Sequence, residues 1–366
     1  MKFVLAFDSF KHCLRAGEVC RFAADGIRSA LPSAEILEIP LADGGEGTVD
    51  AACLAAGKTP AQIPVTGPLG EKRIAAVLQD GNLAVMEVAS ACGIEFVPPE
   101  RRNPLETTTF GVGELVRELA RRGVRKCVVG LGGSATVDGG IGLLRALGMK
   151  FWDASGRETD SLLRAVKAGS VPDLPMEICV ASDVENGLTG SCGAAKVFGP
   201  QKGATPEMAE ALDKALERFL TLFGAESAPG DGAAGGLGFA FRMLGAKRMS
   251  GAGWMLEYTD FDRKIKGADL VVTGEGASDF QTADGKLPWV VAGHAAASGI
   301  PAALVSGNLG KGYEMLGGRF VSMSSLASGP RTLEECLRSA PEELRRVGRN
   351  LAGLAAIGKN ASCRVK

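Results

Sequence analysis

The sequence predicts an α/β protein built from two domains, and three observations support this prediction. The chain has 366 residues, which is more than one small domain holds. Short apolar segments alternate with segments of helical spacing, a pattern typical of parallel sheets covered by helices on both faces. Two apolar segments around Asp80-Gly81 instead predict a β-hairpin. We therefore expect a parallel, flavodoxin- or Rossmann-like sheet in one domain and a mixed sheet in the other.

Apolar spacing and turn residues predict the individual elements. Residues 2–7 are the first predicted strand, and the helix after them carries Val19, Phe22, Ala23 and Ile27 on one face. A second helix is expected to begin with Thr205 as its cap and Pro206 in its first turn, and to end before Gly224. Further strands are predicted at 35–41, 126–131, 269–273, 301–306 and 319–324, a helix at 111–122, and a C-terminal helix containing Leu344, Val347, Leu351 and Leu354.

The position of the hairpin predicts a discontinuous domain organisation. Residues 1–65 and 266–366 are expected to build the parallel-sheet domain together, and residues 66–265 are expected to form an inserted domain with the mixed sheet. Residues 287–310 carry no acidic or strongly basic side chain, but prolines and glycines interrupt them. The interruptions favour a helix, a turn and a strand over a membrane span.

Charge and cysteine content exclude several classes of protein. The 41 Lys and Arg residues balance 42 Asp and Glu residues, so the net charge is −1. This balance gives no electrostatic reason to expect nucleic acid or a membrane surface as a partner. The nine cysteines are odd in number and include no CxxC pair, which favours a reducing compartment, and we expect a cytoplasmic protein.

Glycines and acidic residues together follow four of the apolar segments. In parallel sheets, ligands bind beyond the carboxyl ends of the strands, and glycines there let backbone N–H groups approach an anion. Acidic side chains at such a loop repel phosphate unless a cation lies between them, so the pattern indicates phosphate bound together with Mg²⁺. The four loops are residues 42–48, 132–140, 182–186 and 273–281.

Simpler interpretations of the same residues remain open. Asp43 and Glu46 have the spacing of a helix cap and its partner, and residues 132–134 could be only a tight turn. Lys11, Lys202 and Lys286 follow or precede such loops and could bind an anion or lie in solvent. It is the presence of four similar loops in one chain that favours a binding site.

Several enzyme classes lack their motifs in this chain. There is no GxxxxGK[ST] phosphate loop, no protein-kinase signature and no GxSxG nucleophile elbow. No GxGxxG follows the first strand, which weakens a dinucleotide-binding interpretation. His12 and His294 are the only histidines, so neither a histidine-based triad nor a multi-histidine metal site is expected, although His12 could contact a substrate.

Taken together and in order, the loops resemble the bacterial glycerate kinase family, which includes the glycerate 2-kinases. The resemblance covers about the first 310 residues, and the C-terminal part matches only loosely. The matching stretches are DSFK (8–11), ADGGEGT (42–48), VTGPLG (65–70), NP (103–104), TFGVGEL (109–115), GLGGSAT and DGG (130–140), SDV-N (182–186), VFGPQKGAT (197–205), GAAGGLG (232–238) and TGEG--D-QT (273–282).

The resemblance implies a transferase that phosphorylates D-glycerate with ATP and Mg²⁺, giving 2-phosphoglycerate or 3-phosphoglycerate. It also implies an active site in the cleft between two α/β domains. Val137, Gly187 and Ala277 stand where the family usually has Asn, Pro and Arg, so another small hydroxy acid stays open as the acceptor. A non-catalytic sensor of an anionic metabolite is the alternative from another class, and the oligomeric state is open, a homodimer included.

Within this interpretation, each matching loop has an expected role. Lys11 is expected to bind the transferred phosphoryl group or the glycerate carboxylate, and Asp183 and Asp279 are candidates for Mg²⁺ ligand or general base. The expected acceptor-binding residues are Asp8, Ser9, Asp43, Gly44, Gly45, Glu46 and Gln281. The residues expected to bind the nucleotide phosphates are Gly132, Gly133, Ser134, Lys202, Gly274, Glu275 and Gly276.

Overall fold

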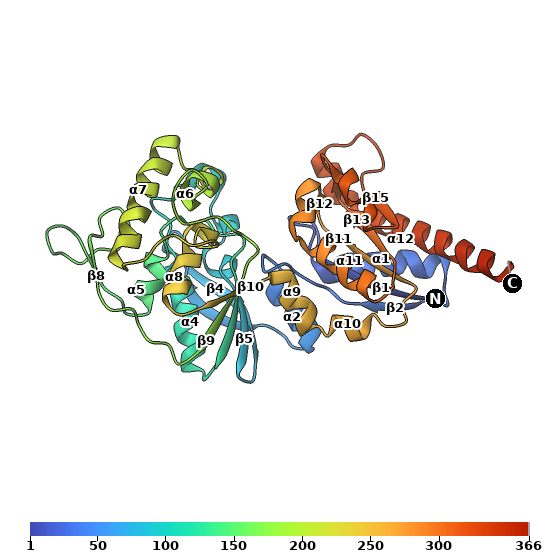
Figure 1. Ribbon diagram of the computed structural model, residues 1–366, viewed down its shortest axis with the longest axis horizontal. Coiled ribbons are helices and arrows are strands. Elements are labelled where there is room, and N and C mark those ends of the chain that lie inside the picture. The colour runs from blue at the N-terminus through green and yellow to red at the C-terminus, as the bar shows by residue number, and fades with distance from the viewer. Residues whose placement is uncertain (365–366) are drawn as a thin grey trace. The chain divides into compact units, whose positions relative to one another are not determined.

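The computed structural model describes residues 1–364, with side chains up to residue 357, and the chain forms two compact units. Unit 1 comprises residues 1–43 and 50–57 and the chain from residue 252 onward; unit 2 comprises residues 44–49 and 58–251. In Figure 1 the blue and the orange-to-red parts of the chain build unit 1, and unit 2 runs mainly from light blue through green to yellow. The two ends of the sequence thus fold together.

Unit 1 contains a sheet of five strands that are all parallel, in the order β15-β13-β11-β1-β2. The strands are β1 (Lys2–Phe7), β2 (Glu35–Glu38), β11 (Leu270–Gly274), β13 (Ala302–Ser306) and β15 (Ser322–Ser325). The regular part of β2 is shorter than expected, although the Ile39 N–H still donates to the Leu5 carbonyl at 2.8 Å and the Leu41 N–H to the Phe7 carbonyl at 2.9 Å. Strand β15 begins later than expected, because Arg319 still closes the preceding 3₁₀ turn.

Both faces of this parallel sheet are covered, which explains the uninterrupted apolar sequence of β1. Phe3 and Leu5 are buried on one face with α1 and α12, and Val4 and Ala6 on the other face with α9 and α11. A strand buried on both faces has no position for a polar side chain. The helices are α1 (Ala16–Ala30), α2 (Thr48–Ala56), α9 (Gly251–Tyr258), α10 (Phe261–Lys264), α11 (Leu287–Ala297) and α12 (Leu333–Arg364).

Unit 2 contains a six-stranded mixed sheet in the order β10-β9-β6-β5-β4-β3. Strands β5, β6, β9 and β10 are parallel, and β3, β4 and β5 are antiparallel neighbours. The predicted hairpin joins β4 to β5, with Asp80 paired to Leu83 and Gly81 at φ 58° in its turn. The strands are β3 (Ala61–Thr66), β4 (Lys72–Asp80), β5 (Leu83–Glu87), β6 (Lys126–Gly130), β9 (Glu177–Ala181) and β10 (Lys247–Met249). The predicted fold class is therefore confirmed for both sheets.

Helices pack on this mixed sheet around one large apolar core. The cap predicted for α7 is present, since the Thr205 hydroxyl accepts a hydrogen bond from the Met208 N–H at 3.2 Å. The helices of unit 2 are α3 (Ala89–Cys92), α4 (Phe110–Arg121), α5 (Ile141–Ala146), α6 (Ala194–Phe198), α7 (Pro206–Leu222) and α8 (Leu237–Met243). Two short strand pairs complete the chain, β7 (Phe151–Trp152) with β8 (Lys167–Ala168), and β12 (Ala277–Ser278) with β14 (Asn308–Leu309).

Short 3₁₀ turns connect many of these elements. They are Ile94–Phe96, Pro99–Arg101, Pro200–Lys202, Ala233–Gly235, Phe280–Asp284 and Tyr313–Gly318. Residues 287–310 form α11, a turn, β13 and β14, as the prolines and glycines in this segment predicted. Throughout the part of the chain that the structure describes, every helix is too short or too polar to cross a lipid bilayer.

Candidate active site

The acidic loops of unit 1 meet at one edge of its sheet. Asp8 follows β1, Asp43 lies beyond β2 and Glu275 follows β11, and because these strands are parallel, their carboxyl ends lie at the same edge. There they line a pocket of about 800 Å³. Other polar or glycine residues of this pocket are Ser9, Lys11, Gly276, Lys286, Gly307, Asn308 and Arg331. Six of the predicted site residues are thereby brought together.

The charged forms of two carboxylates in this pocket are disfavoured. Asp8 is buried, and burial, reinforced by the negative charge of Asp43, raises its pKa well above the usual range, although its carboxylate accepts a hydrogen bond from the Ser9 N–H at 2.7 Å. Burial also raises the pKa of Glu275, against the opposing effect of Lys286 at 3.8 Å. Three acidic side chains close to two lysines make a site that would be stabilised by an additional cation.

Two features of the segment after β1 favour binding at this pocket. The Ser9 hydroxyl is buried and has no hydrogen-bond partner among the described residues, so a ligand atom there would satisfy it. Lys11 lies on a tight loop that is closed by a hydrogen bond from the Phe10 N–H to the Leu14 carbonyl at 2.8 Å. His12 has a φ of 61°, which is uncommon for a residue with a side chain. The exposed Lys11 side chain is therefore presented by a backbone that is already ordered.

Asp279 and Gln281 lie just after this loop region, and neither lines the pocket. Asp279 caps the 3₁₀ turn Phe280–Asp284, because its carboxylate accepts a hydrogen bond from the Gln281 N–H at 2.9 Å. Its carboxylate is also 3.6 Å from the Lys286 ammonium group. These contacts hold Asp279 at the start of the turn and place its carboxylate beside Lys286, which does line the pocket.

In unit 2 the segment 44–49 crosses the carboxyl ends of β6 and β9, and its glycines are required for this approach. A Cβ atom on Gly44 would lie 2.6 Å from the Ala181 carbonyl oxygen, and one on Gly132 would lie 2.6 Å from the Gly45 Cα atom. Helix α2 begins at Thr48, so Asp43 and Glu46 do not occupy the cap and third positions of a helix. The glycines of this loop are thus explained first by packing.

A buried lysine supports the loop after β6. The Lys202 ammonium group donates hydrogen bonds to the Ser134 hydroxyl at 2.9 Å and to the Thr136 carbonyl at 2.8 Å, and the lysine is only 3% exposed. Burial lowers the pKa of Lys202 to about 8, although Cys92 and Asp138 oppose the shift. An ammonium group cannot accept a hydrogen bond, so the Ser134 oxygen must accept and its hydrogen is left to be donated elsewhere.

The same loop has unused backbone donors. Within the described residues, the N–H groups of Gly132 and Gly133 have no hydrogen-bond acceptor, and Gly133 has a φ of 78° that favours glycine. Two free N–H groups, a hydroxyl hydrogen and a buried ammonium group form an arrangement that suits a phosphate or carboxylate. Glu46 and Asp183 are exposed, and Asp183 follows β9 at the same edge of the sheet.

The candidate carboxylates suit a magnesium ion that is also bound by the phosphates of a substrate. Over the residues that the structure describes, no group of three or more His, Cys, Asp or Glu side chains could hold a metal ion. The candidate ligands Asp183 and Asp279 belong to unit 2 and unit 1 respectively. Mg²⁺ is commonly held by one or two carboxylates, water molecules and substrate phosphates, and this donor set is compatible with that mode alone.

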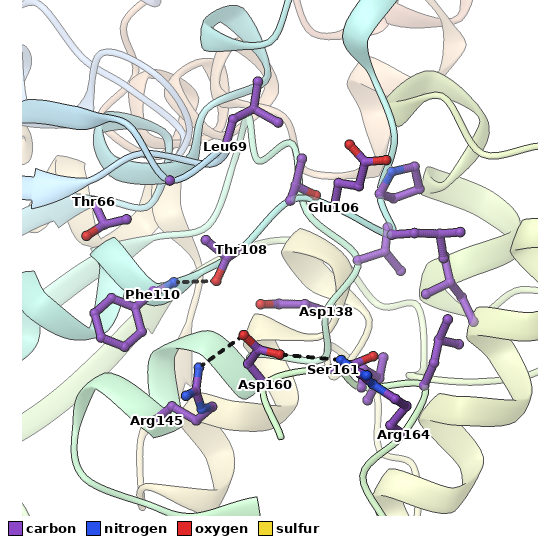
Figure 2. A pocket seen from close by; sticks show the side chains of 18 residues that line it. Thr66, Leu69, Glu106, Thr108, Phe110, Asp138, Arg145, Asp160, Ser161 and Arg164 are labelled. Atoms are coloured by element: carbon purple, nitrogen blue, oxygen red, sulfur yellow. Dashed lines mark hydrogen bonds and ion pairs between the residues drawn. The ribbon is translucent and has the colours of Figure 1, made fainter. Parts of the chain in front are cut away.

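A second pocket, of about 460 Å³, lies in unit 2 (Figure 2). Its charged side chains already have partners, because Arg145 and Arg164 share Asp160, each at 3.9 Å. Asp138 accepts hydrogen bonds from the N–H and hydroxyl of Thr109 and from the N–H groups of two glycines. This pocket contains none of the predicted site residues.

The sequence interpretation overlooked two contributors to these sites. Glu87, at the end of β5, accepts a hydrogen bond from the Val49 N–H at 2.6 Å and so fixes the segment 44–49 to the sheet. An acidic residue at the end of an otherwise apolar strand was the available signal. The second contributor is the segment 326–340, which forms one wall of the unit 1 pocket and has no recognisable motif.

Comparison with known proteins identifies the family. The chain matches the glycerate kinase family over residues 3–356. It is 38% identical to a protein named glycerate kinase from Bacillus cereus (strain ATCC 10987 / NRS 248), with 98% of each chain covered. It is also 38% identical to a protein named glycerate 2-kinase from Escherichia coli (strain K12), with 98% of this chain and 99% of that protein covered.

This chain belongs to the glycerate kinase family. A crystal structure of a Salmonella typhimurium LT2 protein is similar to it in fold, with a TM-score of 0.84 at 39% identity and with 98% of this chain and 99% of that chain covered. The resemblance stated from the loops is therefore confirmed, and it extends beyond the first 310 residues to nearly the full chain.

Proposed function

We propose that the protein is a glycerate kinase that transfers the γ-phosphoryl group of ATP, with Mg²⁺, to a hydroxyl group of D-glycerate. The observation that carries this proposal is the unit 1 pocket, where Asp8, Lys11, Asp43 and Glu275 come together from separate loops. Phosphoryl transfer requires positioned cations and carboxylates rather than a covalent nucleophile. Membership of the glycerate kinase family supports the choice of acceptor. Glycerate 2-kinase relatives favour the 2-hydroxyl group, with the 3-hydroxyl group as the alternative.

In this proposal the unit 1 pocket binds the reacting groups. The Asp8 carboxylate accepts the hydrogen bond of a glycerate hydroxyl and can take its proton as transfer is completed. Lys11 neutralises the transferred phosphoryl group or the glycerate carboxylate. Gly274 and Gly276 bring the backbone close to the nucleotide phosphates, and Glu275 is held for this by hydroxyl groups of its own loop.

Unit 2 contributes an anion-binding loop in the same proposal. Gly132, Gly133 and Ser134 donate hydrogen bonds to an anionic group of a substrate, and Lys202 acts through Ser134 rather than by direct contact. Mg²⁺ would be held by Asp183 or Asp279 and would neutralise the charge of the phosphates when bound. Gly44, Gly45, Glu46 and Gln281 complete the acceptor site as proposed shaping residues. The cleft between the two units stays a prediction.

The proposal is tested by following ADP release from D-glycerate, ATP and Mg²⁺, and by ³¹P NMR of the product. Glycerate-dependent ADP release with a single phosphoglycerate signal is the expected result, and the chemical shift and coupling of that signal identify the hydroxyl group. ADP release with other hydroxy acids but not with D-glycerate would favour the related phosphotransferase. Binding of D-glycerate without any phosphorylation would favour the sensor.

A further inference from the structure

The unit 1 pocket has two chemically different walls. Its polar wall is built by the loops that carry Asp8, Lys11, Glu275 and Lys286. A second part of the lining comes from the segment 326–340, which includes the first turns of α12 and also contributes Arg331 and Ser339. The apolar side chains of that wall are Leu326, Pro330, Leu333, Leu337 and Ala340. A three-carbon hydroxy acid offers nothing to cover such a wall.

Size also indicates a ligand larger than glycerate. Pockets of roughly 300–1,000 Å³ usually enclose drug-sized ligands, and this pocket measures about 800 Å³. Leu333 is 75% exposed and lines the pocket, so its side chain is available for contact with a ligand. The pocket therefore has both space and apolar surface beyond what the acceptor substrate uses.

The apolar wall is ordered in advance by a buried carboxylate of α12. Glu343 is 8% exposed and accepts hydrogen bonds from the Ser328 hydroxyl at 2.8 Å and the Arg331 guanidinium at 2.9 Å. Arg331 in turn donates to the Ser339 hydroxyl at 3.0 Å. These contacts fix the loop that precedes α12 to the helix itself, as expected for a binding surface that is largely formed before its ligand arrives.

We propose that the segment 326–340 forms the nucleoside subsite of the unit 1 pocket, with the base and ribose of the nucleotide against Leu333 and its apolar neighbours and the phosphates directed to Lys11, Lys286 and the Gly274–Gly276 loop. This inference rests on the proposed function for the identity of the nucleotide. A nucleotide carries an apolar base and a polyanion in one molecule, and it matches both walls. An apolar ligand would leave the lysines and acids unused, and a small acid would leave the exposed Leu333 uncovered.

The test compares ADP with inorganic tripolyphosphate, both with Mg²⁺, by calorimetric titration of the full-length protein. Leu333→Ser removes apolar contact without adding charge, and because Leu333 is exposed at the first residue of α12, we expect the fold to be kept. The expected result is about ten-fold weaker ADP binding, as partial loss of a leucine's apolar contact predicts, with unchanged tripolyphosphate binding. In turnover, the KM for ATP should rise while the KM for D-glycerate stays constant.

Ile357→Ser is the matched control, because Ile357 lies on the same helix, is 67% exposed and does not line the pocket. Unchanged ADP affinity in the Leu333 variant, equal weakening of tripolyphosphate, or no ADP binding by the wild-type protein would each overturn the nucleoside subsite. The results distinguish failure of the nucleoside subsite from failure of the proposed glycerate kinase activity. Glycerate phosphorylation with an unaffected Leu333 variant removes only the subsite, and nucleoside-dependent ADP binding without glycerate phosphorylation removes only the acceptor.

Discussion

Lys202→Met tests whether the buried ammonium group is kept for function at a cost in stability. Methionine has a similar length and no charge, so it can occupy the same buried position. Burial lowers the pKa of Lys202 from 10.5 to about 8, and this shift corresponds to about 3 kcal/mol by which the charged lysine opposes folding at pH 7. The substitution also leaves the Ser134 hydroxyl and the Thr136 carbonyl without this donor, at roughly 1–3 kcal/mol.

The two effects oppose each other at pH 7, so we expect the variant to be about as stable as the wild type there. The pH dependence separates them. Because the folded-state pKa lies below the unfolded one, the cost is fully present below pH 8 and disappears as the pH rises toward 10.5. Between pH 7 and pH 10 the wild type should therefore gain ~2–3 kcal/mol relative to Lys202→Met, measured as the free energy of unfolding in urea.

Activity should fall, although stability at pH 7 stays about the same. Loss of the charge that holds Ser134 as a donor should lower kcat/KM about 100-fold, the usual size for one lost charge-assisted donor. Lys214→Met is the matched control on the neighbouring helix, since Lys214 is exposed and its charge stays in water in both states. A stability difference that does not change between pH 7 and pH 10, together with near-normal turnover, would refute the reasoning.

Three further substitutions probe the other loops. Lys11→Ala should lower turnover by at least about 100-fold with an unchanged circular dichroism spectrum, because the side chain is exposed and proposed to contact the reacting groups; near-normal turnover would remove Lys11 from the mechanism. Asp43→Asn removes a negative charge that helps burial to raise the pKa of Asp8, so the acid limb of kcat/KM should move to lower pH. An unmoved limb would show that another group controls it. Gly44→Ala should destabilise by about 3 kcal/mol in urea, whereas Gly70→Ala, with φ 85° and open space around it, should cost only about 1 kcal/mol; equal losses would contradict the packing argument.

The predictable part of the fold was the part specified by short-range patterns. Continuous apolar strands identified the parallel sheet, because a strand covered on both faces leaves no place for polar side chains. Asp80-Gly81 identified the hairpin, because glycine allows the positive φ that its tight turn requires. Thr205 identified the start of α7 through its capping hydroxyl. Each of these signals depends on residues within a few positions of one another.

The site was predictable only as a set of loops. Glycines and acids at strand ends marked Asp8, Asp43 and Glu275, since the carboxyl ends of parallel strands share an edge. The raised pKa values of Asp8 and Glu275 could not be predicted, because they depend on burial and on distances between loops far apart in the chain. The apolar wall at 326–340 escaped prediction because leucines at helical spacing have the same pattern whether they line a pocket or a core.

By itself the sequence determined the two kinds of sheet, the family and the glycine- and acid-containing loops at the strand ends, because periodic burial and turn chemistry are local properties of the chain. Only the tertiary structure decided that Lys202 lies buried beneath Ser134, 68 residues away in the sequence, and that Gly44 packs against Ala181 at the end of β9. Contacts of this kind depend on topology, because topology brings distant segments to one edge of a sheet. Burial at that edge then determines how closely the backbones approach and which charge state the side chains favour.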